Sequence, residues 1–136
     1  MRQVIRNRDT IIERLRNSKY TTDIIPQGIL DAVRKGGINI YVVNDGSSCY
    51  FHLGGGIIVV SIEQALLYCN SYELNLDQAI ESIICHELGH HLMFLSDIPQ
   101  PEKPYVERLA WLLGRQFLHL TSVPSNIYTY LTVYIN

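Results

Sequence analysis

The hydrophobic positions of the chain recur every three or four residues over several stretches, and this spacing predicts helices. The helices are expected at about residues 3–18, 26–35, 62–73, 76–95 and 104–120. The helix over 76–95 is expected to begin with a capping box, because Asn75 precedes it and Gln78 stands three residues later. With roughly 20 residues, this helix would be about 30 Å long and run through the core.

Between the second and third expected helices the pattern changes to short β-branched runs. Two strands are expected at Ile38–Val43 and Cys49–Leu53, joined as a hairpin by the turn-forming residues 44–47. After three glycines, the apolar run Ile57–Val60 predicts a third, well-buried strand. The last ten residues fit either a helix or a strand. The pattern therefore predicts an α+β fold, with a three-stranded sheet packed on the helix over 76–95 and further helices around it.

Composition and length describe an ordinary globular chain. Its 136 residues are 47% hydrophobic and 18% charged, which predicts one domain over residues 1–136 with a single core. No apolar run approaches the roughly 20 residues of a membrane-spanning helix, and no secretory signal pattern is present at the N-terminus. The three cysteines are odd in number and lack CxxC spacing, which favours a reducing cytoplasm. We expect a cytoplasmic protein without membrane contact.

The charge is distributed unevenly along the chain. Residues 1–19 carry six Lys/Arg against Asp9 and Glu13, a local charge of +4, while the whole chain carries −2, so the other residues carry −6. A basic helix at 1–19 is a solvated arm or a contact for nucleic acid or an acidic partner. The acidic remainder argues against nucleic-acid binding as the main function.

One motif indicates a specific chemistry. His86 and His90 in the sequence HELGH stand four positions apart, so both imidazoles lie on one face of the expected helix and can reach one metal ion. Glu87, between them, is placed to act as a general base on water at that ion. An HExxH motif on a helix predicts a zinc-dependent hydrolase.

A catalytic zinc site usually has three protein ligands, so a further ligand is expected. The longer metzincin motif is not met, because Met93 and Ser96 replace its glycine and last histidine. Glu107 is the first candidate, at the start of a helix that can pack antiparallel on the HELGH helix. Two small residues on its face, Ala110 and Gly114, allow close approach of the two helices. Glu102, in the proline-rich loop before it, is the second candidate.

Other polar and aromatic residues have less specific expectations. His91 points about 100° away from His90 and is expected to be structural. His52 is a candidate for contact with substrate or with the reaction oxyanion. Tyr105 is either a hydrogen-bond donor to a tetrahedral intermediate or a packing residue. Trp111 is expected in the core.

The chain resembles a known protein family at these motifs. HELGHHL at residues 86–92, the strand region Ile38–Ser61 before it and Glu107-Arg-Leu-Ala110 after it are similar to the ImmA/IrrE-type zinc metallopeptidases, over about residues 26–124. These are minimal zincins of phages, mobile elements and bacteria. The resemblance implies that His86, His90 and Glu107 bind zinc and that Glu87 is the catalytic base. It also implies a helix-turn-helix repressor as partner. Trp111 departs from the family, whose members often carry a small polar residue there.

Three functions from different classes are compatible with these patterns. The first is a zinc endopeptidase that hydrolyses a specific protein, with the strand at Ile57–Ser61 offering an edge for an extended substrate. The alternative is a catalytically silent zincin-fold protein that sequesters a repressor or defence protein. A third reading, a nucleic-acid-binding factor led by residues 1–19, predicts strongly salt-dependent binding.

Overall fold

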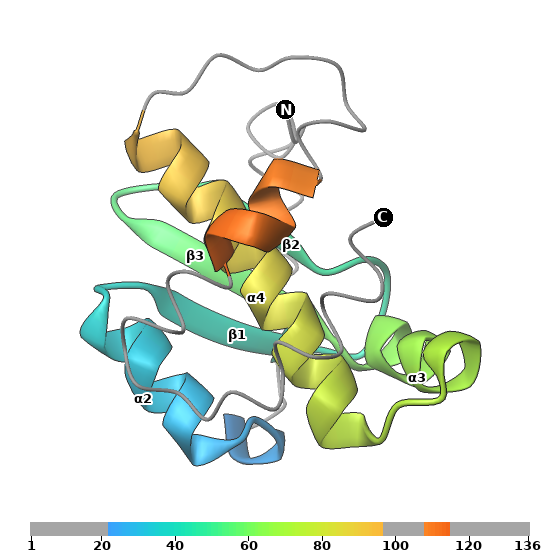
Figure 1. The fold of residues 1–136 in the computed structure, drawn as a ribbon. Coiled ribbons are helices and arrows are strands. Elements are labelled where there is room, and N and C mark those ends of the chain that lie inside the picture. Colours follow the sequence, from blue (N-terminus) through green and yellow to red (C-terminus); the bar gives the residue numbers. More distant parts are fainter. Residues whose placement is uncertain (1–21, 97–107, 115–136) are drawn as a thin grey trace.

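The computed structural model describes residues 22–96 and 108–114, which form an α+β domain with a three-stranded mixed sheet (Figure 1). A short 3-10 helix, Thr22–Ile24, precedes the main elements, and residues 108–114 are helical. The main elements are α2 (Gln27–Lys35), β1 (Asn39–Val43), β2 (Cys49–His52), β3 (Gly56–Ser61), α3 (Ile62–Tyr72) and α4 (Leu76–Leu95). These bounds confirm the expected strands and the helices at 26–35, 62–73 and 76–95. The helix expected at 3–18 and the last ten residues lie outside the described residues.

The sheet order differs from the expected one. Its order is β1-β3-β2, with β1 parallel and β2 antiparallel to β3, so the expected hairpin between β1 and β2 is wrong. The C-terminal end of β3 lies between β1 and β2 and forms hydrogen bonds with the turn that joins these two strands. The backbone N–H of Ser61 donates to the Ser48 hydroxyl (2.8 Å), and the Ser61 hydroxyl donates to the Gly46 carbonyl (2.8 Å). The turn is therefore wider than a two-residue hairpin turn, because it passes around a third strand.

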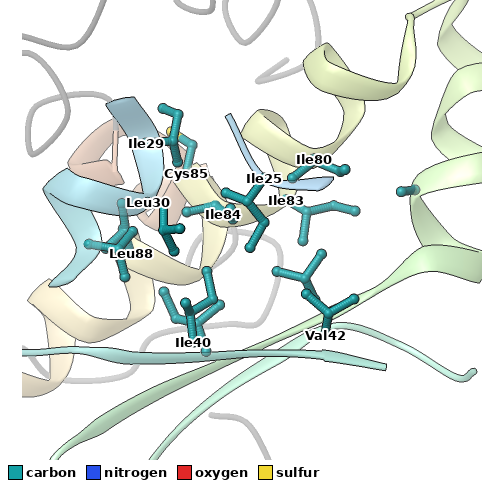
Figure 2. Close-up of a cluster of buried hydrophobic side chains, with 14 of the residues drawn as sticks. Ile25, Ile29, Leu30, Ile40, Val42, Ile80, Ile83, Ile84, Cys85 and Leu88 are labelled. Carbon is teal, nitrogen blue, oxygen red and sulfur yellow. The ribbon is translucent and has the colours of Figure 1, made fainter. Parts of the chain in front are cut away.

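The central strand β3 is buried along its whole length. Ile58 and Val60 belong to the main core, while Ile57 and Val59 belong to a second cluster on the other face of the sheet. A strand covered on both faces has no solvent side, which explains its continuous apolar run instead of an alternating pattern. Figure 2 shows the main core, in which side chains of α2 and α4 meet Ile40 and Val42 of β1.

The helix α4 is the central element of the fold. The Asn75 side chain accepts from the Gln78 backbone N–H (2.8 Å), and the Gln78 side chain accepts from the Asn75 N–H (2.9 Å), so the expected capping box is confirmed. Between Ala79 and Met93 nearly all of its side chains are buried, including the whole HELGH segment. A helix buried on all sides forms a rigid support for functional side chains.

Within residues 22–96 and 108–114, no helix combines the length and apolar character that crossing a membrane requires.

Candidate metal centre

The two histidines of HELGH converge on one point. Their Nε2 atoms are 3.2 Å apart, and each side chain is only 8% exposed. Two nitrogens bound to a tetrahedral zinc at about 2.0–2.1 Å would be separated by about 3.3 Å. The spacing of His86 and His90 therefore matches that of two ligands of a single ion, as their positions in the sequence predict.

Glu87 lies between the two histidines in the middle of α4. Its side chain is 3% exposed, so a carboxylate is placed in the interior of the protein next to the imidazole pair. Burial of a carboxylate opposes folding unless other groups compensate it. Such a residue at this position favours a chemical role over a role in packing, because an apolar side chain would fill the space without that cost.

The helical segment 108–114 packs directly on α4. A Cβ atom added to Gly89 would overlap the backbone of Ala110, and one added to Gly114 would overlap the carbonyl of Cys85. Higher numbers on one helix thus meet lower numbers on the other, so the two helices run in opposite directions along their contact. Figure 1 shows the segment crossing α4. The prediction that Ala110 and Gly114 permit close approach is confirmed.

Trp111 forms a wall beside the imidazole pair. Its ring centroid lies 4.7 Å from that of His86, at an interplanar angle of 52°. The indole is half-buried and packs against the main core, so the core expectation is correct only in part. Its contact with His86 was missed, because the periodicity of one helix carries no information about the side chains of another. The signal available in the sequence was its position next to Ala110, on a helix already expected to cross HELGH.

His91 is part of the framework under the site. It is buried, and its Nδ1 forms a hydrogen bond of 2.8 Å with the Tyr50 hydroxyl, whose direction follows the tautomer of the imidazole. A Cβ atom added to Gly56 would lie 2.9 Å from the same imidazole ring. The structural role expected for His91 is therefore confirmed, because its ring attaches α4 to both β2 and β3.

Desolvation keeps this buried pair uncharged. Burial raises the pKa of Tyr50 to about 12, so the phenol retains its proton at neutral pH. Burial, with a smaller contribution from His52, lowers the pKa of His91. A neutral imidazole therefore faces a neutral phenol.

Substitution of Tyr50 by phenylalanine is expected to destabilise the fold by about 1–2 kcal/mol, because the buried Nδ1 of His91 loses this partner. Urea denaturation measures the change in the free energy of unfolding. The matched control is Tyr41→Phe on β1, where the half-buried phenol faces the second core cluster and a change within about 0.5 kcal/mol is expected. Equal effects of the two substitutions would contradict a specific role for the Tyr50–His91 bond.

His52 lies at the end of β2, beside the last turns of α4. Its ring stacks on Phe94, with centroids 4.6 Å apart and an interplanar angle of 19°. The alternation of side chains along β2 explains why Tyr50 and His52 both face α4. The structure thus brings His52 to the helix that carries the histidine pair, and its expected contact with substrate remains a prediction.

The expectation that the strand Ile57–Ser61 offers an edge to substrate is wrong. This strand, β3, is paired on both sides, so its backbone groups are engaged with β1 and β2. The physical reason is its continuous apolar character, which suits a central position better than an edge. In the described sheet the outer strands are β1 and β2, and of these two β2 lies closer to the α4 backbone.

Several expected site residues fall outside the part of the chain that the structure describes. They are Glu107, Glu102 and Tyr105. Among residues 22–96 and 108–114, no three His, Cys, Asp or Glu side chains come together to hold a metal ion. The described part therefore supplies a pair of imidazoles, and the third ligand remains a prediction.

Comparison with known protein families, with curated proteins and with solved structures found no match for the chain. The resemblance to ImmA/IrrE-type metallopeptidases thus stays a prediction from the motifs at residues 86–92 and 107–110.

Proposed function

We propose that the protein is a cytoplasmic zinc-dependent endopeptidase that hydrolyses a specific protein target. The observation that supports this proposal most is the 3.2 Å separation of the His86 and His90 Nε2 atoms on one buried helix, with Glu87 between them. Two imidazoles and a neighbouring carboxylate are the parts that an HExxH hydrolase needs. By the family resemblance, a helix-turn-helix repressor of a phage or mobile element is the proposed target.

The donor set fits zinc. Imidazole nitrogen is a preferred zinc ligand, and the spacing of the pair suits bonds of about 2.0–2.1 Å. We propose Glu107 as the third ligand, because it stands three residues before Ala110, whose backbone lies against Gly89 between the two histidines. Three protein ligands would leave the fourth position of a tetrahedral zinc for water, as catalytic sites require.

In the proposed mechanism each side chain has one role. Zinc, when bound, supplies a positive charge that polarises the scissile carbonyl and makes water more acidic. Glu87 accepts the proton of the attacking water and later transfers it to the nitrogen of the leaving amine. Burial of Glu87 keeps bulk water from competing for that proton. His52 and Tyr105 are the proposed contacts to the substrate or its oxyanion.

Metal binding can be followed by intrinsic fluorescence, because Trp111 is the single tryptophan and its ring lies against His86. Cobalt(II), a zinc substitute that quenches nearby fluorophores, is expected to reduce Trp111 emission and to saturate at one ion per chain. His90→Ala should weaken cobalt binding by at least about a hundredfold. Even the mutation of a residue that is only hydrogen-bonded to a metal ligand lowers metal affinity by about ten- to a hundredfold.

The matched control is His52→Gln, a change on the neighbouring strand that leaves both proposed histidine ligands in place. It should bind cobalt as the unmodified protein does. Absence of saturable quenching, or equal affinities of the unmodified protein and His90→Ala, would contradict the metal centre. Zinc content of the purified protein, together with fragments of a co-purified partner, tests the endopeptidase assignment directly.

A further inference from the structure

An exposed aromatic residue continues the line of the two histidines along α4. Phe94 follows His90 by four residues, as His90 follows His86, so the three side chains form one stripe that turns by about 40° at each step. The two histidines are buried, whereas Phe94 is 45% exposed. The stripe therefore passes from the buried imidazole pair to a half-exposed phenyl ring within about 6 Å along the helix axis.

Among the ring contacts of the described residues, the Phe94 ring has one partner, which lies against one of its two faces. The imidazole of His52 stacks on it nearly in parallel, with centroids 4.6 Å apart. His52 is itself half-buried and is held at the end of β2, a strand that packs on α4. The aromatic pair is thus supported by two rigid elements, so its position relative to the histidines is fixed by the fold.

We infer that Phe94 and His52 form a specificity subsite for an apolar, preferably aromatic, side chain next to the scissile bond. This inference rests on the proposed endopeptidase function. In an extended peptide, side chains on the same side are about 7 Å apart and consecutive residues advance by about 3.4 Å. A peptide bond held beside His90 therefore places a neighbouring side chain within reach of a ring one helical turn away.

The chemistry of the subsite selects an apolar group. A half-exposed phenyl ring gains by covering its surface with another apolar or aromatic side chain, and stacked or edge-on ring pairs add to that gain. A carboxylate would lose hydration there without a compensating partner on the Phe94 ring. The subsite therefore favours phenylalanine, tyrosine or leucine over aspartate at this position of the target.

The test uses two hydroxamic acids that chelate zinc equally and differ only in one substituent beside the chelating group, benzyl or methyl. With the full-length, zinc-loaded protein, isothermal titration calorimetry is expected to show about tenfold tighter binding of the benzyl compound. Phe94→Ala should reduce this ratio to about one to two and leave the affinity for the methyl compound unchanged. Phe94→Tyr, which retains the ring, should preserve the preference.

The matched control is Leu66→Ala, which removes an apolar side chain of similar exposure from α3. This helix lies beside the N-terminal end of α4 (Figure 1). Leu66→Ala should keep the tenfold ratio. If Phe94→Ala fails to fold, His52→Ala provides the second variant, and the ratio is expected to fall in it as well.

The outcomes separate this inference from the function on which it rests. Failure of both compounds to bind the unmodified protein contradicts the zinc centre and with it the proposed function. Binding of both with equal affinity, or a benzyl preference that survives in Phe94→Ala and His52→Ala, overturns the subsite and leaves the zinc centre standing.

Discussion

Gly89→Ala is expected to destabilise the protein by about 3–5 kcal/mol. The added Cβ would occupy the position of the Ala110 backbone carbonyl, and a carbonyl cannot move aside as a flexible side chain can. In an isolated helix the same substitution would stabilise, because alanine is a better helix former than glycine by about 1 kcal/mol. The sign of the measured change therefore decides between close helix packing and simple helix propensity.

Urea denaturation of the metal-free protein measures this effect without any contribution from bound zinc. The matched control is Gly28→Ala in α2, where an added Cβ meets no atom within 4 Å. That variant is expected to be stabilised by about 0.5 kcal/mol. Ala110→Gly should not rescue Gly89→Ala, because the overlap involves the Ala110 backbone and not its methyl group. A stabilising Gly89→Ala would show that the two helices do not approach closely.

Features of this fold that join residues close together in the sequence could be predicted from the sequence. The capping box at Asn75 and Gln78 joins groups three residues apart, and α4 begins where it predicts. The four-residue spacing of His86 and His90 likewise determines their convergence through the geometry of a single helix. Such features depend on helix geometry alone, so tertiary packing does not alter them.

The order of the strands depends on contacts that no local pattern encodes. The turn residues after Val43 are compatible with a hairpin, yet the chain passes around Ser61 and places β3 between its two predecessors. Burial of β3 on both faces favours this order, and its apolar run was a signal of a central strand. The edge role that we expected for β3 was wrong for the same reason.

The surroundings of the histidine pair also come from tertiary packing. Trp111 against His86 and His52 against Phe94 each join residues from different elements, so their distances follow from how those elements pack. Only the small residues Ala110 and Gly114 predicted from the sequence that another helix would pack closely against the HELGH segment. The histidine pair of the proposed metal site is therefore predictable from the sequence, while the residues packed around that pair are not.

Glu87→Gln is expected to abolish hydrolysis of the target while zinc remains bound. Glutamine has the shape of glutamate but cannot accept the proton of the attacking water, and loss of a general base lowers rates by about a hundred- to ten-thousandfold. The proposed ligands are untouched, so cobalt should still quench Trp111 with an affinity close to that of the unmodified protein. Rates of target cleavage and cobalt titrations, measured on the same preparations, provide the two readouts.

The matched control is Glu81→Gln, a carboxylate of the same helix less than two turns before Glu87. Burial, and to a lesser degree the charge of Asp77, raises the pKa of Glu81, so its ionised form is disfavoured in the fold. Removing that charge is expected to leave cleavage unchanged and to stabilise the protein slightly at pH 7. The stabilisation should disappear as the pH falls and Glu81 takes up a proton, because a raised pKa reduces stability only where the group is ionised.

The same pair of variants separates the enzyme from the sequestering protein. If the biological effect on the target persists in Glu87→Gln with zinc bound and no fragments formed, binding alone accounts for it and the base has no function. If the effect and the fragments disappear together, while Glu81→Gln retains both, hydrolysis is the activity. The distinction depends on one proton acceptor, since the two variants differ only in which carboxylate of α4 becomes an amide.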